Sequence, residues 1–325
     1  MPATPLSPVG PIVAPAADDR LITVSVAADG ELLALWCADA DWAALYYHDP
    51  PLRTDIPRDK ALRQVDLRVS VHRPAGTDVW TVPSPPFPSP TVQLLPDDRI
   101  LLASSRCAWR PGAGADRNAI IYRRNGTVES ESTFGNGFTH LLADLDGAVW
   151  AGYGAPGIFG DNGWGPPLGP PPVGSPGLVR FSPADMRPAW AYPADTAWGP
   201  VVSCDALNVD DYAVWVCYSH GSPSIRIAQG EVTGWHTNNL RGVRALAVNE
   251  PAIGLFGGHD TDANRLVLGS LCDGQVQISG QYRVVMPDGN PADHIRMHGR
   301  GSVLHTVIDG AWYQLALTDL SASAQ

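Results

Sequence analysis

The chain has 325 residues, 44% of them hydrophobic, so it is long enough for one large domain or for two ordinary ones. Its formal net charge of −11 repels phosphate backbones and anionic lipid, which argues against nucleic acid and membrane as partners. Lys60 is the single lysine and no glycine-rich loop precedes it, which argues against a Schiff-base or P-loop lysine mechanism.

The five cysteines are scattered and form no CxxC pair, so we expect free thiols. The first residues contain no basic region followed by an apolar run, and no segment approaches ~18 consecutive apolar residues. We therefore expect a soluble, cytoplasmic protein that is a monomer or a weak dimer.

Residues 1–20 are rich in Pro and Ala and are expected to be flexible, followed by a single domain over 21–325. From there on, a turn with Asp or Gly and a short apolar run recur along the chain. An apolar strand precedes each of these runs, so the repeated unit begins as a strand–turn–strand pair. The runs start at Asp29, Asp97, Asp146, Asp210, Glu250 and Gly299.

Further strand-like runs follow several of these pairs, as in residues 118–124 and 127–134. Four antiparallel strands in a unit of ~40–50 residues are typical of a propeller blade. We predict an all-β, six-bladed β-propeller, with five-bladed and seven-bladed rings as alternatives. The last unit is short, and a strand from around Pro11 to Ala14 is a candidate to complete it.

One blade carries a recognisable repeat pattern, D-G-x-Φ-W-x-G followed by G-L-x-R-F, over residues 146–152 and 177–181. It resembles the regulator-type and NHL-type propellers and, at the level of blades only, gluconolactonase- and strictosidine-synthase-like propellers. The resemblance implies the fold, but such repeats occur in sensors, scaffolds and enzymes alike.

The resemblance to gluconolactonase-like hydrolases implies a calcium ion that is held by side chains of the inner strands. Asp205 and Asn208 fit that pattern, but the inner strands at 21–28 and 91–96 carry no acid, which argues against a calcium hydrolase. We assign no metal ligand and expect no organic cofactor, while a divalent Mg²⁺ or Ca²⁺ ion stays open.

Loops on one face of the predicted propeller are rich in Trp, Tyr and His, which suits a concave small-molecule site. For the Trp residues, packing of the loop is an equally good interpretation. The predicted substrate-binding residues are Trp42, Tyr47, Trp109, Trp164, His220, Arg244 and His259.

Polar residues on the inner strands form a second set, because charged groups on enclosed strands need partners or solvent. His140, Asp205 and His294 are the predicted catalytic residues, a histidine acting as general base beside an orienting carboxylate. The alternative is a water-filled channel whose polar side chains satisfy one another.

The sequence thus favours an enzyme acting on a small molecule, of lyase, isomerase or cyclase type, since no activated Ser or Cys is evident. A non-catalytic propeller that binds a ligand or docks a protein is the main alternative, and a structural module without a site is the third.

Overall fold

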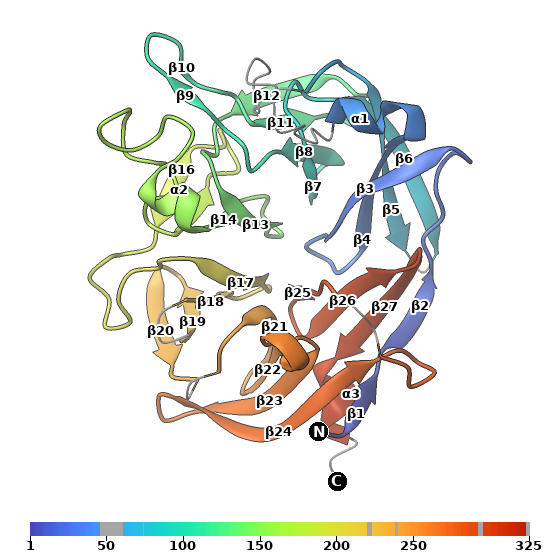
Figure 1. The fold of residues 1–325 in the computed structure, drawn as a ribbon, viewed down its shortest axis with the longest axis vertical. Helices are drawn as coiled ribbons and strands as arrows, with labels where there is room; N and C mark the ends of the chain where they lie inside the picture. Colours follow the sequence, from blue (N-terminus) through green and yellow to red (C-terminus); the bar gives the residue numbers. More distant parts are fainter. Residues whose placement is uncertain (46–60, 74, 220–222, 238–239, 292–294, 323–325) are drawn as a thin grey trace. The chain divides into compact units, whose positions relative to one another are not determined.

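The computed structural model describes residues 1–45, 61–73, 75–219, 223–237, 240–291 and 295–322. The chain divides into two compact units: residues 1–13 with 193–325 form unit 1, and residues 14–192 form unit 2. Each unit contains three large sheets built on four antiparallel strands, and one sheet of unit 1 gains a fifth, parallel strand from the N-terminal residues. Figure 1 labels most of the strands.

Unit 2 contains the sheets of the first half of the chain, and in each the strands are hydrogen-bonded in chain order. The first sheet comprises β3 (Asp19–Val26), β4 (Leu32–Ala38), β5 (Asp66–Arg73) and β6 (Gly76–Pro83). The second comprises β7 (Thr91–Leu95), β8 (Arg99–Ala103), β11 (Ala119–Tyr122) and β12 (Val128–Ser132). The third comprises β13 (Phe138–Ala143), β14 (Val149–Tyr153), β15 (Leu178–Phe181) and β16 (Pro188–Ala191).

Unit 1 contains the remaining sheets. The first comprises β17 (Cys204–Val209), β18 (Val214–Tyr218), β19 (Ser224–Ala228) and β20 (Glu231–Trp235). The second comprises β21 (Val243–Asn249), β22 (Ala252–Gly257), β23 (Arg265–Cys272), β24 (Gln275–Val285) and the added strand β1 (Ala3–Pro5). The third comprises β25 (His298–Arg300), β26 (Val303–Ile308), β27 (Ala311–Ala316) and β2 (Ser7–Pro11).

Short elements connect these sheets. They are the hairpin of β9 (Trp109–Arg110) and β10 (Gly114–Ala115), the 3-10 turns η1 (Asp39–Asp41) and η2 (Asp260–Asp262), and the helices α1 (Trp42–Leu45), α2 (Ala155–Phe159) and α3 (Leu317–Ala322). No helix in the described part of the chain is both long and apolar enough to span a bilayer.

These six sheets, each with four antiparallel strands and one with β1 added, are the blades of a six-bladed β-propeller, which confirms the predicted fold class and the propeller resemblance. In each blade the first strand of the predicted strand–turn–strand pair is the inner strand. The inner strands are β3, β7, β13, β17, β21 and β25.

The N-terminal residues are strands, not the flexible segment expected over 1–20. β2 pairs antiparallel with β27 and supplies the outermost strand of the last blade, while β1 pairs in parallel with β24. Figure 1 shows both in blue beside the orange and red strands. The strand that completes the last blade ends at Pro11, so it lies earlier than the expected position around Pro11 to Ala14.

In two blades an aspartate of the first hairpin holds the tryptophan of the second strand; Asp210 opens the predicted run of its blade, whereas Asp144 lies two residues before the run at Asp146. In unit 2, Asp144 accepts a hydrogen bond from the Trp150 indole at 3.4 Å, and in unit 1 Asp210 accepts one from Trp215 at 2.9 Å. Each carboxylate also accepts backbone N–H groups of its own turn. Each of these aspartates therefore closes its turn and fixes the large side chain of the second strand.

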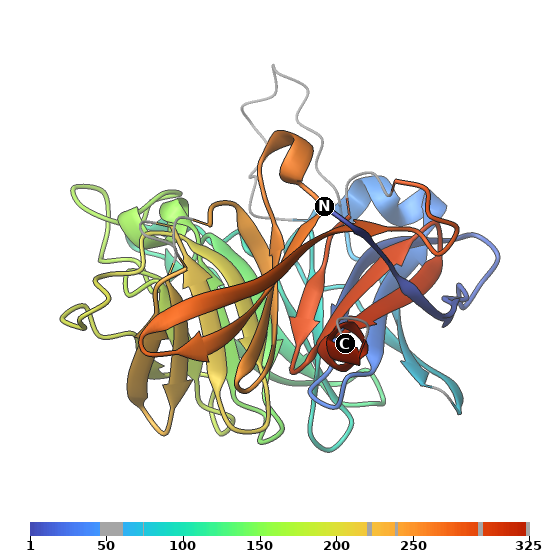
Figure 2. The ribbon, with the colours of Figure 1, turned by 90° about the horizontal axis from the view of Figure 1, so that it is seen from below.

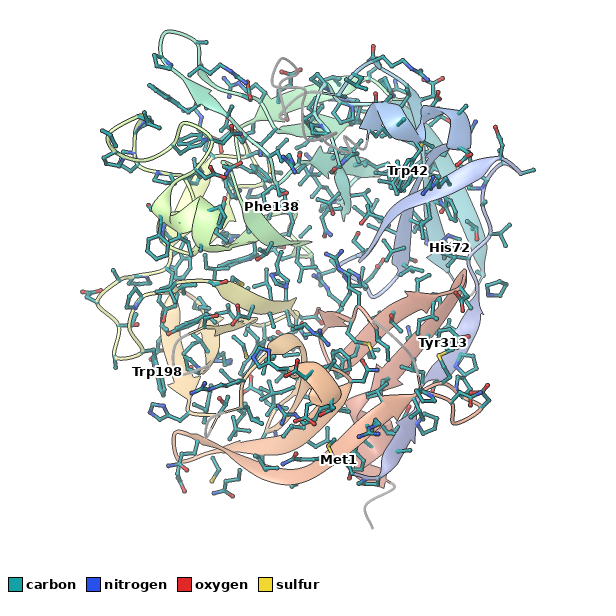
Figure 3. All side chains as sticks on the ribbon, in the orientation of Figure 1. Met1, Trp42, His72, Phe138, Trp198 and Tyr313 are labelled. Atoms are coloured by element: carbon teal, nitrogen blue, oxygen red, sulfur yellow. The ribbon has the colours of Figure 1, made fainter. Side chains whose placement is uncertain are left out.

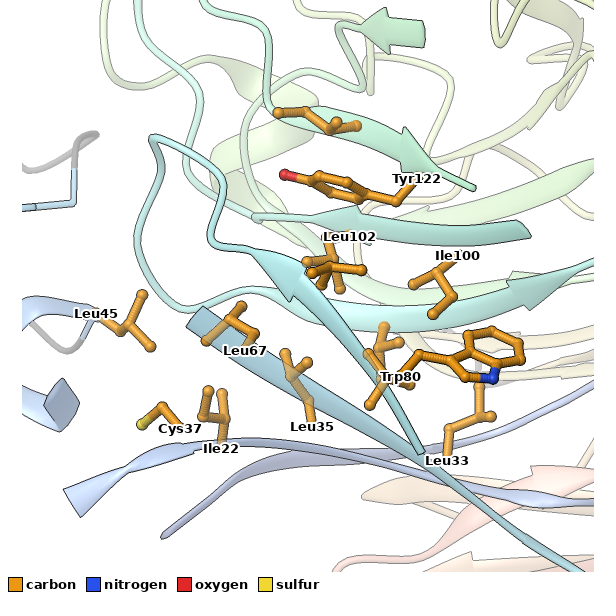
Figure 4. Packing of buried hydrophobic residues seen from close by; sticks show 14 of the residues in the cluster. Ile22, Leu33, Leu35, Cys37, Leu45, Leu67, Trp80, Ile100, Leu102 and Tyr122 are labelled. Carbon is orange, nitrogen blue, oxygen red and sulfur yellow. The ribbon is translucent and has the colours of Figure 1, made fainter. Parts of the chain in front are cut away.

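The core of each unit lies between neighbouring sheets. In unit 2, Leu33, Leu35, Leu67 and Trp80 of the first sheet pack against Ile100, Leu102 and Tyr122 of the second, as Figure 4 shows. In unit 1, one cluster joins the first and second sheets, and another joins the second and third. Leu6, between β1 and β2, belongs to the latter cluster and is 2% exposed.

We expect Leu6→Ala to lower the free energy of unfolding by about 3 kcal/mol, because it leaves a cavity between two sheets. Val9→Ala, on the exposed part of β2, is the matched control and should cost less than about 1 kcal/mol. Urea denaturation of both variants measures the difference. Equal effects would contradict the placement of Leu6 in the core.

Candidate functional site

Four of the inner strands carry a β-bulge close to their start. Strands β3, β13, β17 and β21 each place two residues opposite one at this point, and the extra residues are Ile22, Thr139, Asp205 and Arg244. A bulge takes its extra residue out of the ladder and redirects its side chain, and bulges are frequent beside active sites. Two of the four are predicted site residues, so we take the bulges of unit 1 as the candidate site.

Asp205 is half-buried and accepts hydrogen bonds from two serines. The Ser219 hydroxyl donates to its Oδ2 at 2.7 Å, and the Ser203 hydroxyl donates to the same carboxylate. The Ser219 N–H also donates to the Ser203 carbonyl at 3.0 Å, so the two serines face each other beyond the hairpin of β17 and β18.

Burial raises the pKa of the Asp205 carboxyl above its ordinary value, although the two serine hydrogen bonds lower it. Desolvation thus outweighs hydrogen bonding to the charged form. Such a carboxyl takes up and releases a proton closer to neutral pH than an exposed aspartate, which is the property of an acid–base group.

Arg244 is the exposed bulge residue of β21, the inner strand that packs against β17. Its guanidinium donates to the Ala263 carbonyl and lies 5.8 Å from the centre of the Phe256 ring. The backbone beside it is close-packed: a Cβ at Gly257, whose φ is +127°, would lie 2.3 Å from the Gly242 carbonyl oxygen. Glycine therefore permits the approach of the strand ends that hold the bulge.

His259 is exposed and precedes η2, which Figure 2 shows in orange beyond the ends of the strands. Its carbonyl accepts the Asp262 N–H at 2.9 Å, and the Asp262 carboxylate pairs with Arg265 at 3.3 Å. Asp205, Arg244 and His259 thus all belong to unit 1: Asp205 on its first sheet, Arg244 on its second, and His259 in the connection after β22.

Trp109 and Trp164 belong to unit 2 and support a loop. Trp164 is 7% exposed, and its indole N–H donates to the Cys107 carbonyl at 2.8 Å. The Trp109 N–H donates to the Asn162 carbonyl at 3.0 Å, and a Cβ at Gly169 would lie 2.8 Å from the Trp109 ring. These contacts fit the packing interpretation, and the predicted role of the two residues in ligand binding stays a prediction.

Trp42 and His140 are also in unit 2. Trp42 on α1, labelled in Figure 3, has the Arg20 guanidinium 3.8 Å from its ring centre. His140 is half-buried next to the bulge residue Thr139, whose hydroxyl lies 3.0 Å from its Nδ1. The three other predicted residues, Tyr47, His220 and His294, lie outside the described residues.

Two buried histidines were not singled out from the sequence. His72 on β5, labelled in Figure 3, lies 2.9 Å from the Ser70 hydroxyl and 3.3 Å from that of Thr77, and burial lowers its pKa. His305 on β26 accepts a hydrogen bond from the Trp312 indole at 3.3 Å. Burial, with a smaller contribution from Arg300, lowers the pKa of His305 to about 4.

Over the described ranges, no group of three or more His, Cys, Asp or Glu side chains is placed to hold a metal ion. The five cysteines are free, and burial raises the pKa of Cys107 and of Cys217 to about 12. Thiols with such pKa values are poor nucleophiles at neutral pH.

No known protein family matches the chain, and no curated protein matches it. Among solved structures, the chain is similar to the extracellular domain of a putative one-component system from Bacteroides thetaiotaomicron, with 10% identity and a TM-score of 0.42 over 95% of this chain. This chain spans only 40% of that one.

Two further similar structures match this chain over most of their own length. The PQQ-bound aldose sugar dehydrogenase of Streptomyces coelicolor is 14% identical with a TM-score of 0.44, covering 93% of this chain and 99% of the enzyme. Apo AztD of Citrobacter koseri is 12% identical with a TM-score of 0.43, covering 91% and 83%. At these scores the similarities carry no argument about function.

We expect the stability of the protein to fall on acidification because of His305. The unfolded chain binds a proton on this residue below pH ~6.5, whereas the folded state does so only near its pKa of about 4. Stability is therefore lost as pH falls through this window, by roughly 2 kcal/mol between pH 7 and pH 5.

Urea unfolding at pH 7 and at pH 5 tests this. For each protein, the quantity compared is the decrease in the free energy of unfolding between the two pH values. The loss should shrink in His305→Gln and persist in His259→Gln, which removes an exposed histidine. An unchanged pH dependence in His305→Gln would show that other groups cause it.

Proposed function

We propose that this protein is a propeller enzyme that acts on a small molecule, with Asp205 as its acid–base group. The observation that carries the proposal is the half-buried Asp205 carboxyl, which a bulge directs out of the ladder and whose pKa is raised. Lyase, isomerase or cyclase chemistry fits such a group, because these reactions need a proton moved at a fixed position.

In this proposal Arg244 and His259 bind the substrate from the second sheet of unit 1, and Ser203 and Ser219 hold the Asp205 carboxylate. The catalytic roles of His140 and His294 stay predictions. So do the cytoplasmic location, the monomer or weak dimer, the lack of nucleic-acid and membrane partners, and the open question of Mg²⁺ or Ca²⁺.

Asp205→Asn tests the proposal, with Asp211→Asn in the exposed turn at the other end of the same hairpin as its control. Thermal-shift screening with small aromatics, lactones, oligosaccharides and terpenoid diphosphates should find one class that stabilises the wild type. Turnover of that class should fall at least ~100-fold in Asp205→Asn and stay unchanged in Asp211→Asn.

The pH profile distinguishes the two roles of the carboxyl. If Asp205 is the base, turnover falls as pH drops through its raised pKa, and if it is the acid, turnover falls as pH rises through that pKa. Full activity of a folded Asp205→Asn variant would refute the proposal.

Protein docking is the second candidate function, and one observation favours it. Phe159 and Leu168 are 67% and 70% exposed on the insertion after β14. The Leu168 N–H donates to the Gly165 carbonyl at 3.0 Å, and a Cβ at Gly165 would lie 3.2 Å from the Phe159 carbonyl oxygen. One compact loop therefore presents both apolar side chains to solvent, as at many protein interfaces.

We expect a Phe159→Ser/Leu168→Ser double variant to lose any specific protein captured by the wild type from its source cells. Val128→Ser, which removes an exposed apolar side chain on strand β12, is the control and should still capture the same protein. Quantitative mass spectrometry of pull-downs measures the difference. Equal capture by the wild type and the double variant would exclude this loop as the docking surface.

A further inference from the structure

The two bulges of unit 1 put a carboxyl and a guanidinium at matching positions of neighbouring strands. Asp205 is the extra residue between Cys204 and Ala206, and Arg244 is the extra residue between Val243 and Ala245. Strands β17 and β21 pack against each other, so the two bulges belong to one surface of the unit. This inference deepens the proposed function and rests on it.

Arg244 keeps most of its hydrogen-bonding capacity for a ligand. Two other arginines of unit 1 are neutralised, since Arg226 pairs with Glu250 at 2.9 Å and Arg265 pairs with Asp262. Within the described ranges Arg244 pairs with no carboxylate, and its one hydrogen bond goes to a backbone carbonyl. A guanidinium has five N–H donors in a planar fork, so several are left for an oxyanion.

The Ala263 carbonyl and the Phe256 ring both contact the guanidinium of Arg244. Because this side chain is already partly held in place, it loses less conformational entropy when a ligand binds to it. Asp205 does not compete for it, since among the described contacts no ion pair joins the two residues. The serine hydroxyls hold the Asp205 carboxylate but leave some of its lone pairs free. Neither group is paired with the other, and the strands that carry them are neighbours.

A ligand at this site would contact three groups of the protein: the Arg244 guanidinium, the Asp205 carboxyl and the Ser219 hydroxyl. Their chemistry indicates which groups the ligand carries. The guanidinium suits a carboxylate or a phosphate, bound through two parallel hydrogen bonds. The carboxyl of Asp205 and the hydroxyl of Ser219 suit a hydroxyl group of the ligand. The net charge of −11 does not prevent this, because charges beyond ~8 Å are largely screened at physiological salt.

We infer that the substrate is a small hydroxylated acid, whose oxyanion Arg244 holds while one of its hydroxyl groups lies against Asp205 and Ser219. The oxyanion is a carboxylate or a phosphate monoester, which offer the same geometry to a guanidinium.

Matched sets of probes test the inference by calorimetry and ligand-observed NMR. One set is glycerate, glycerol 3-phosphate and glycerol, and the other is glucuronate, glucose 6-phosphate and glucose. Members with an oxyanion should bind the wild type and the neutral members should not. Whether carboxylates or phosphates bind more tightly identifies the oxyanion.

Arg244→Gln should weaken that binding about 10- to 100-fold, the effect of losing a hydrogen bond to a charged group. Arg244→Lys keeps the positive charge but loses the planar set of N–H donors, so its affinity should lie between those of the wild type and Arg244→Gln. Arg283→Gln removes another exposed arginine of unit 1 and should bind as the wild type does.

The outcomes separate this inference from the proposed function. No binding by any anionic probe at millimolar concentration, or equal binding to Arg244→Gln, overturns the inference. If a neutral compound binds and is turned over in a way that needs Asp205 but not Arg244, the proposed function stands and the inference fails. Turnover that is unaffected in Asp205→Asn refutes the proposed function itself.

Discussion

The side chain of Asn208 fixes the three inner strands of unit 1 to one another. Its Nδ2 donates to the carbonyls of Leu246 and Gly301 at 2.8 and 2.9 Å, and its Oδ1 accepts the Gly301 N–H at 2.8 Å. An inner strand has no ladder partner on its free edge, so these buried backbone groups need another one. One amide supplies it for β21 and for the turn after β25, and the Val248 N–H adds a hydrogen bond to the Gly301 carbonyl at 2.8 Å.

This constraint also sets the geometry of the candidate site. Asp205 lies on the same strand as Asn208, and Arg244 lies on the strand whose Leu246 carbonyl Asn208 holds. The bulges can therefore turn their side chains outward while the strands stay fixed. In unit 2, Ser25 and Gln93 make the comparable links to the Val92 carbonyl and the Ala143 N–H. A rigid inner layer below redirected side chains is the arrangement that a preorganised site requires.

The sequence predicted the blades because their strands carry local signals, such as the aspartate, the turn and the tryptophan of residues 210–215. It could not predict the bulges, since a bulge depends on which residues of the neighbouring strand are paired. Charge on an inner strand marks Asp205 and Arg244 in the sequence, whereas the pairing that redirects their side chains depends on the neighbouring strands β18 and β22. The burial of Trp164 escaped prediction because a Pro/Gly loop has no periodicity that marks its inner side. Strand β2 lies a few residues before the position expected around Pro11 to Ala14, since prolines weaken the strand signal of this whole segment although a sheet edge tolerates them.

The pairing of the N-terminal strands has a consequence for how the chain folds during synthesis. Ala3 pairs with Arg283 and Ser7 with Gln314, so the residues of β1 and β2 find their partners only after the distant strands β24 and β27 have been made. Bringing such distant segments together is entropically costly and is typically a slow step. Until then the segment is an unpaired strand, the kind of element that recruits other chains into aggregates. Pro5, Pro8 and Pro11 lack the N–H donor that such recruitment uses, so the segment can wait for its own partners while being a poor template for others.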